Sequence, residues 1–232
     1  MHTFLLPISE NQVIYTLSLE DQRHLIKVLR AKINNFIHIM DGKGRLFLAQ
    51  LISLQPAQVK ILEKIKEKPL PAYRIQIAFS WTKRSERTEW FIEKAVEMGL
   101  NDFFPIICER SERTNFSEER VQRIIHAAAQ QSLNLHLPIF HPLQEFSEIL
   151  KLKTPNRFIA HCLPEERKKI TQVAQVKEDI LCLIGPEGDF SKTEIEAAKN
   201  SGFTPIVLGD FRLRSETAAL FSLFEMIHFR GE

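Results

Sequence analysis

The feature that most constrains the fold is a pair of similar blocks near the end of the chain, LIGPEGDFS at residues 183–191 and LGDFRLRSETAAL at residues 208–220. In each block an apolar run ends in a glycine turn, and a helix is expected to follow. Strands joined by a crossover helix run parallel, so the two turns should meet at one edge of a sheet. In open α/β sheets ligands bind beyond the carboxyl ends of the strands, which makes this edge the expected ligand site.

Local signals predict where the two helices begin. In the first block Ile180–Ile184 has the pattern of a buried strand, and Ser191 with Glu194 has the pattern of a capping box. In the second block the expected strand is 205–208, and Ser215 is the expected N-cap of the terminal helix.

Alternating strand and helix patterns extend from Arg74 to the end of the chain and predict a mainly parallel sheet covered on both faces. Strands are expected at 75–80, 103–108, 158–162, 180–184 and 205–208. Helices are expected at 85–98, 117–133, 143–152, 165–175, 191–201 and 215–229.

The first 65 residues show a different pattern, in which short strands dominate. Ser18 and Asp21 would cap the one helix, and Leu25, Val28 and Leu29 would form its apolar face. Strands with little helix in so short a segment predict a small β-barrel. The strands are expected at 4–8, 35–41, 45–54 and 58–65.

A charged segment with two prolines, residues 64–73, separates the two patterns. Pro69 and Pro71 cannot lie inside a central strand, so we expect one domain at 1–70 and a second at 71–232.

Several frequent site motifs are absent from the sequence. No GxGxxG follows the first strand of the second domain, which disfavours a Rossmann-type nucleotide site. The P-loop, GxSxG and HExxH patterns are also absent, which disfavours the commonest NTPases, hydrolases and zinc proteases. We expect no metal site, because no metal-ligand spacing joins the histidines at 126, 136, 141 and 161.

Composition predicts an ordinary globular protein of the cytoplasm. No run of 18 apolar residues and no export signal occurs in the sequence, so neither a membrane span nor secretion is expected. Cys108, Cys162 and Cys182 are odd in number and lie in apolar surroundings, and each is expected to be a small buried hydrophobe.

The two C-terminal blocks resemble those of the RsmE-type members of the SPOUT methyltransferases, which methylate N3 of a uridine in small-subunit ribosomal RNA. Two earlier stretches are similar to further signatures of this family. They are HLIKVLR at residues 24–30, and the series from Lys94 through EMGL at 97–100 to Pro105 and Arg110. The resemblance therefore covers most of the chain.

The resemblance implies an α/β fold with a SPOUT-type parallel sheet and a C-terminal trefoil knot, preceded by a small PUA-like β-barrel. True knots are nearly absent among folds, so residue patterns alone would not predict one. The family also implies a homodimer that binds S-adenosylmethionine and acts on 16S ribosomal RNA of the small subunit. The terminal helix is apolar on a wide arc, which fits either deep burial or a subunit interface.

In such an enzyme the turns of the knot hold the cofactor. Glycines allow close backbone approach, and apolar side chains can wall an adenine slot. His161, at the end of a strand, is expected to line the same pocket. The expected cofactor-binding residues are His161, Gly185, Pro186, Glu187, Gly188, Leu208, Gly209, Leu213, Thr217, Ala218 and Ala219.

Methyl transfer to uridine N3 requires a proton to leave, and negative charge then spreads to the ring oxygens. A fixed cation would stabilise that charge. Arg214 is the expected cation, and Glu216 is expected either to orient it or to take the proton.

The first 72 residues carry ten Lys/Arg and six Asp/Glu, which fits an RNA-docking module about as well as it fits an ordinary solvated surface. The expected RNA-binding residues are His24, Arg30, Lys83, Arg84, Lys94 and Arg110.

The sequence departs from the family pattern at three places. Asp189 replaces a third glycine after GPEG, residues 210–212 replace a Pro-Arg-aliphatic stretch, and residues 129–134 have Gln and Asn where Glu and Arg are frequent. Two other functions stay open: a SPOUT methyltransferase with another target, such as a ribose 2′-hydroxyl of transfer RNA, or a non-catalytic RNA-binding assembly protein.

Overall fold

The computed structural model describes residues 2–9, 11–174 and 177–230. The described chain forms two compact units. One comprises the chain up to Leu70 together with His126–Leu137, and the other comprises Pro71–Ile125 together with the chain from Pro138 onward. No helix within the described ranges is long and apolar enough to cross a membrane.

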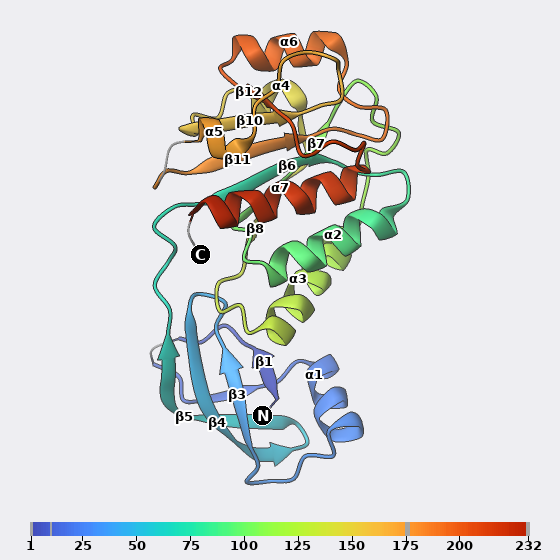
Figure 1. The fold of residues 1–232 in the computed structure, drawn as a ribbon. Helices are drawn as coiled ribbons and strands as arrows, with labels where there is room; N and C mark the ends of the chain where they lie inside the picture. Colours follow the sequence, from blue (N-terminus) through green and yellow to red (C-terminus); the bar gives the residue numbers. More distant parts are fainter. Residues whose placement is uncertain (1, 10, 175–176, 231–232) are drawn as a thin grey trace. The chain divides into compact units, whose positions relative to one another are not determined.

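The first unit is built on a curled sheet of five strands in the order β1-β3-β4-β5-β2 (Figure 1). β1 and β3 pair in parallel, and the other pairs are antiparallel. Three register shifts along the β4–β5 pair have the character of bulges, which bend strands. The strands are β1 (Thr3–Leu5), β2 (Ile14–Thr16), β3 (Phe36–Met40), β4 (Arg45–Leu54) and β5 (Ala57–Glu67).

The helix of this unit begins where the sequence predicted. Ser18 caps α1 (Leu19–Arg23), and its hydroxyl accepts a hydrogen bond from Asp21 N at 3.0 Å. The helix then widens into a π-helix, η1 (His24–Val28). The wider turn changes which side chains share a face. The expected apolar face is therefore wrong at Val28, which is exposed.

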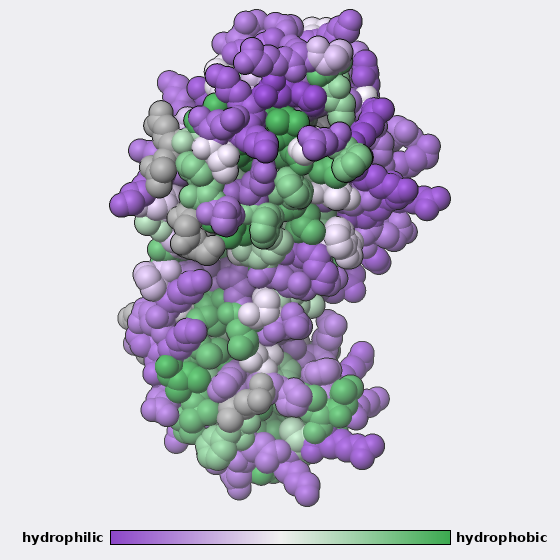
Figure 2. Space-filling view, in the orientation of Figure 1, coloured by the Kyte–Doolittle hydropathy of each residue, from purple (hydrophilic) through white to green (hydrophobic). Residues whose placement is uncertain are grey.

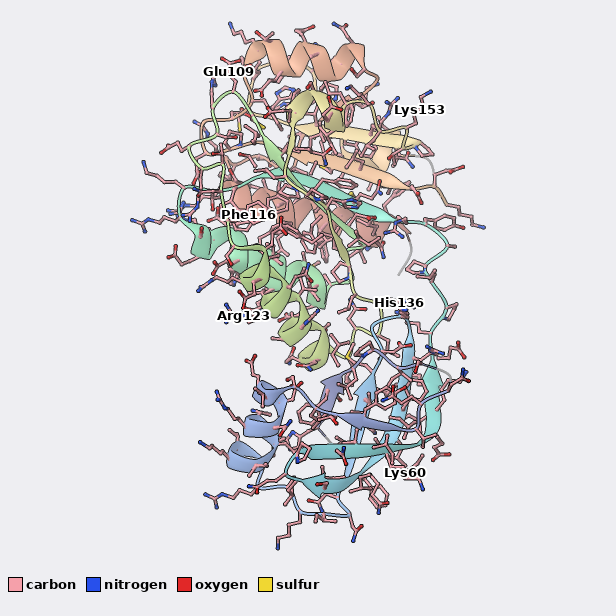
Figure 3. The ribbon with its side chains drawn as sticks, turned by 180° about the vertical axis from the view of Figure 1, so that it is seen from behind. Lys60, Glu109, Phe116, Arg123, His136 and Lys153 are labelled. Carbon is pink, nitrogen blue, oxygen red and sulfur yellow. The ribbon has the colours of Figure 1, made fainter. Side chains whose placement is uncertain are left out.

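Residues 126–137, which belong to the first unit, contact the turn between β3 and β4. Two main-chain hydrogen bonds make this contact, from Gly44 N to Leu135 O and from Leu137 N to Gly42 O. His136 lies beside the same turn (Figure 3). This part of the chain therefore adds to the barrel-like unit although it comes from the middle of the sequence.

The second unit is built on a parallel sheet in the order β12-β10-β11-β6-β7-β8, with β9 also pairing with β7. β11 reads ILCLI, and all five residues are buried, as expected of a central strand in a parallel sheet that is covered on both faces. The strands are β6 (Ile75–Ser80), β7 (Asp102–Ile107), β8 (Ile139–Phe140), β9 (Gln144–Glu145), β10 (Asn156–Ala160), β11 (Ile180–Ile184) and β12 (Thr204–Ile206).

Helices cover both faces of this sheet. In Figure 1, α2 and α7 lie on one side, and α4 and α6 lie on the other. On the second side a cluster of buried apolar residues, including Phe146, Phe190 and Ile195, joins the helices to the strands. The helices of this unit are α2 (Ser85–Glu97), α4 (Phe146–Ile149), α5 (Ile170–Val173), α6 (Lys192–Asn200) and α7 (Ser215–Arg230). The remaining helix, α3 (Glu118–Ser132), begins in this unit, and its residues from His126 onward belong to the first unit.

Two expected helices are much shorter than predicted. The helix expected at 143–152 is reduced to α4, because residues just before it pair with β7 as β9. The helix expected at 165–175 is reduced to α5, because Lys168 forms a parallel bridge to Ile206 and is extended there. Gln175, the expected end of that helix, lies outside the described residues.

Candidate functional site

A cavity of about 320 Å³ lies at the carboxyl ends of three neighbouring strands of the second unit, β10, β11 and β12. We refer to it as the loop cavity. Its walls come from the β10 loop (residues 161–169), the β11 loop (residues 185–191), the β12 loop (residues 207–214) and the first turn of α7. The expected ligand edge of the sheet is therefore the edge at which the structure has a cavity.

Most of the residues expected to bind a cofactor line the loop cavity. Three do not. Thr217 is exposed on the first turn of α7, Ala219 is buried beneath it, and Gly188 lies beside the Arg110 side chain. The expected residues that line the cavity are His161, Gly185, Pro186, Glu187, Leu208, Gly209, Leu213 and Ala218.

The β11 loop is a tight turn with little room for side chains. Asp189 N donates to Pro186 O at 2.9 Å, and Asp189 has a φ of 64°. A Cβ at Gly185 would lie 3.1 Å from both the backbone N and the ring of Phe190. Phe190 belongs to the buried apolar cluster and cannot easily move aside. A side chain at Gly185 would therefore require Phe190 to move by a few tenths of an ångström.

Hydrogen bonds tie the β11 loop to its neighbours on both sides. Glu187 Oε1 accepts from Lys83 N at 3.0 Å, and Gly188 O accepts from Arg110 Nη1 at 2.8 Å. Asp189 Oδ2 accepts from Cys162 N at 2.8 Å. Each tie reaches a segment that follows a different strand, β6, β7 or β10. The loop is therefore held in one position before any ligand binds.

The capping box at the start of α6 supports the same loop, and it is present as predicted. Ser191 Oγ accepts from Glu194 N, and Glu194 Oε2 accepts from Ser191 N. The other carboxylate oxygen of Glu194 accepts from Glu109 N at 2.8 Å. One buried carboxylate thus caps the helix and also binds the segment that follows β7.

His161 lines the loop cavity as a buried, neutral side chain. Its Nδ1 accepts from Leu163 N at 3.2 Å, so we assign the proton to Nε2. Nε2 lies 3.0 Å from Glu165 Oε1, but the two atoms do not meet the geometry of a hydrogen bond. Burial lowers the pKa of His161, and this effect outweighs the opposing charge of Glu165.

Arg214 lines the loop cavity and is exposed. Its carbonyl accepts from Ala218 N at 2.7 Å, and α7 begins at the next residue. The N-cap is therefore Arg214, and its prediction at Ser215 was wrong by one residue, because the helical hydrogen bonds begin one residue earlier. The Arg214 guanidinium has no hydrogen-bond or ion-pair partner within the described ranges.

Glu216 lies beneath the cavity rather than in its lining. Its carboxylate is largely buried and lies 3.7 Å from Arg87 Nε. Glu216 Oε2 has no hydrogen-bond partner among the residues that the structure describes. The structure therefore pairs Glu216 with Arg87 and shows no contact through which it orients Arg214.

The residues expected to bind RNA lie at several places on the two units. His24 and Arg30 are exposed on the first unit, and Arg84 is exposed on the second. Lys83 pairs with Glu112, Arg110 with Gly188 O, and Lys94 with Glu93 and Glu97. Three of these six side chains thus already have partners within the protein.

Sequence reasoning missed part of the cavity lining, which includes Cys162, Arg167, Phe211 and Arg212. Cys162 was expected to be buried and is exposed, because it lies two residues beyond the end of β10. Cys108 and Cys182 are buried as predicted, and burial raises the pKa of Cys182 to about 12. Phe211 is 88% exposed, a position that no apolar periodicity could have indicated.

No group of three or more His, Cys, Asp or Glu side chains that could hold a metal ion occurs in the described part of the chain.

Comparisons with known proteins identify this architecture. Residues 68–226 match the RNA methyltransferase domain family, and residues 18–63 match the RNA methyltransferase PUA domain family. The chain is 31% identical over 209 residues to the ribosomal RNA small subunit methyltransferase E of Mesomycoplasma hyopneumoniae. The alignment covers 87% of this chain and 89% of that protein.

Two crystal structures have the same fold over nearly the whole chain. A probable rRNA methyltransferase from Porphyromonas gingivalis has a TM-score of 0.91 and 32% identity, with 100% of this chain and 99% of that chain covered. The ribosomal RNA small subunit methyltransferase E of Neisseria gonorrhoeae, bound to S-adenosylmethionine, has a TM-score of 0.87 and 28% identity, with 97% and 96% covered. The PUA-like unit and the SPOUT-type sheet are thereby confirmed, and the chain belongs to the ribosomal RNA small subunit methyltransferase E family.

Proposed function

We propose that this protein is an S-adenosylmethionine-dependent methyltransferase of 16S ribosomal RNA in the cytoplasm, and that N3 of a uridine is the methyl acceptor. Membership of the family supports the reaction class. The observation that carries the proposal is the loop cavity, which is lined by Arg214, an arginine with no side-chain partner among the residues that the structure describes.

The residues of the loop cavity fit S-adenosylmethionine. A volume of about 320 Å³ lies within the range of small-molecule sites. Leu208, Leu213 and Ala218 give the apolar surface that an adenine ring requires, and Glu187 is an acidic group suited to a cationic ligand. When bound, this cofactor supplies a methyl group that is activated by its attachment to a sulfonium.

Arg214 is the proposed catalytic residue. Once N3 of the uracil ring loses its proton, negative charge spreads to the two ring oxygens, and a guanidinium beside them would stabilise it. Arg214 stands at the N-terminus of α7, where the helix dipole adds positive potential. The rest of the catalytic effect comes from holding N3 in line with the methyl group.

Glu216 is the proposed proton acceptor. Its Oε2 is buried and lacks a hydrogen-bond partner among the described residues, so it has capacity to accept a proton or a hydrogen bond. Arg87, at 3.7 Å, would hold the carboxylate in place.

We propose that the chain from residue 1 to residue 70 is a domain that docks RNA and that residues 71–232 form the catalytic domain. His24 and Arg30 would contact RNA from the first domain. Lys83, Arg84, Lys94 and Arg110 would contact it from the second. Their positive charges suit phosphate groups, and such contacts weaken as salt rises.

We also propose a homodimer that uses α7. Phe221 and Phe224 are 39% and 56% exposed on this helix, whereas Leu223 and Met226 are buried. Figure 2 shows apolar residues at the surface over α7, bordered by hydrophilic ones. Exposed aromatic residues on one helix are typical of a subunit contact. The trefoil knot stays a prediction from the family resemblance.

The test is methyl transfer in vitro from labelled S-adenosylmethionine to three substrates: small ribosomal subunits, free 16S RNA and transfer RNA. We expect label in the 16S RNA only, and nucleoside mass spectrometry should identify it as N3-methyluridine. Label in transfer RNA or on a ribose would instead identify a different SPOUT activity. Cofactor binding without transfer to any RNA would support the non-catalytic alternative.

A further inference from the structure

The loop cavity begins where two strands stop pairing. β10 and β11 pair in parallel up to Ala160 and Ile184. Beyond these residues the two segments no longer pair, and residues of both the β10 loop and the β11 loop line the cavity. Neighbouring strands are held about 4.8 Å apart by their main-chain hydrogen bonds. The two loops that follow need another constraint if they are to keep a fixed separation.

Asp189 supplies a contact between these two loops. Its Oδ2 accepts from Cys162 N in the β10 loop, and its Oδ1 accepts from Phe190 N in its own loop, both at 2.8 Å. Hydrogen bonds from main-chain N–H groups to a carboxylate are short and stronger than those between neutral groups. One side chain therefore links the two loops just beyond the last paired residues of their strands.

The backbone conformation of Asp189 is unfavourable for any residue other than glycine, so placing a carboxylate there costs conformational energy. Asp189 has a φ of 64°, in the left-handed region that glycine adopts freely and other residues rarely adopt. A glycine would fit this backbone better but would provide no acceptor. Aspartate is among the few residues that tolerate the conformation, so it can form the turn and the link together.

We infer that Asp189 is a positioning residue: it holds the β10 and β11 loops at the separation that the ligand of the loop cavity requires. The inference depends on the proposed function only in naming that ligand as S-adenosylmethionine. With the link in place, no ordering of the loops has to accompany binding, which increases affinity.

The main test is Asp189→Gly, which relaxes the backbone and removes both acceptors. We expect its affinity for S-adenosylmethionine, measured by calorimetry, to fall about tenfold or more, as expected when hydrogen bonds to a charged group are lost. We expect the midpoint of thermal unfolding to change little, since the relaxed backbone offsets the lost contacts. Amide hydrogen exchange at Cys162 should become faster.

A ligand without positive charge shows whether Asp189 acts by positioning the loops or by attracting the positive charges of the cofactor. 5′-Methylthioadenosine carries the adenosine part of the cofactor without its positive charges. If Asp189 positions the loops, this ligand and S-adenosylmethionine lose affinity by similar factors in Asp189→Gly. A loss confined to the charged cofactor would overturn the inference, because it would show direct recognition of charge.

Two further variants keep the test decisive. Asp189→Asn tolerates the same backbone and keeps one acceptor oxygen, so its affinity should fall between those of the wild type and Asp189→Gly. The matched control Asp210→Asn removes an exposed carboxylate of the β12 loop that does not line the cavity, and its affinity should match the wild type. Wild-type affinity in both Asp189 variants, or affinity lost only in proportion to thermal stability, would overturn the inference. Failure of the wild type itself to bind either ligand would instead contradict the proposed function.

Discussion

Two loops of the same cavity differ in how they are held. The β11 loop is bound by hydrogen bonds through Glu187, Gly188 and Asp189 to segments that follow three other strands. The β12 loop exposes Phe211 and carries Arg212 and Arg214, which have no side-chain partners among the described residues. We infer that the β11 loop is a preformed wall for the cofactor, and that the exposed side chains of the β12 loop, Phe211, Arg212 and Arg214, are left free to meet RNA.

The distinction has a physical basis. Binding a small ligand to a fixed wall avoids the entropic cost of ordering that wall. Cations without intramolecular partners, by contrast, are available for groups that arrive from outside, such as phosphates or a uracil ring that gains negative charge. Substitutions in the β11 loop should therefore change cofactor affinity, and substitutions of the exposed side chains of the β12 loop should change the use of RNA.

The largest effect is expected at Arg214. Arg214→Ala removes a cation that acts only as charge develops, so the single-turnover rate of methylation should fall on the order of a hundred- to a thousandfold. Affinity for S-adenosylmethionine should stay within about twofold of the wild type. Arg214→Lys should recover little activity, because an ammonium lacks the planar fork of a guanidinium. A rate loss explained wholly by weaker cofactor binding would remove Arg214 from the catalytic residues.

The next effect is expected at the preformed wall. Gly185→Ala places a Cβ 3.1 Å from the Phe190 backbone and ring, and the buried ring has little freedom to move. Overpacking of this kind costs about 1–3 kcal/mol, so urea unfolding should show that loss together with weaker cofactor binding. Unchanged stability and unchanged affinity would show that the β11 loop adjusts easily, contrary to the distinction between the loops.

A smaller and more selective effect is expected from a pair of glycine variants. Gly209 has a φ of 134°, and its Cβ position is open, so Gly209→Ala is strained only through its backbone, by roughly 1–2 kcal/mol. At Gly188 φ is not positive, and a Cβ would lie at an ordinary 3.4 Å from Arg110. Gly188→Ala should therefore cost less than about 0.5 kcal/mol. Equal costs in thermal unfolding would show that conformation does not distinguish the two positions.

The smallest effect concerns pH. Because burial lowers the pKa of His161 in the folded state, the unfolded chain takes up the proton first as pH falls. The stability that neutral His161 contributes is therefore complete above its ordinary pKa of about 6.5 and declines below it. Unfolding measured between about pH 7.5 and 5 should show a shallower dependence in His161→Gln than in the wild type. The difference between the two proteins isolates His161 from His38 and His126, whose pKa values are also lowered by burial. Identical slopes would contradict this assignment.

Much of the fold and the site could be predicted where the signal is local. β11 was predicted with its observed bounds, because five apolar residues stand between turn signals. The capping box of Ser191 and Glu194 was also predicted correctly, since both partners lie within four residues. The glycine turns that mark the loop cavity belong to the same class of signal.

Features that depend on distant residues could not be predicted. The link from Asp189 to Cys162 joins residues 27 positions apart, so the sequence showed only an unusual residue in a turn. The two-residue strands β8 and β9 are too short to produce an alternating pattern. The pairing of Glu216 with Arg87 likewise depends on the packing of α7 against α2, and no sequence motif indicates that packing.

The most direct test of the central claim is a position-resolved map of modified uridines in ribosomal RNA from cells that lack this protein. We predict that one N3-methyluridine in 16S RNA disappears, that the wild-type gene restores it, and that Arg214→Ala does not. An unchanged set of N3-methyluridines in the 16S RNA of those cells would contradict the proposed function.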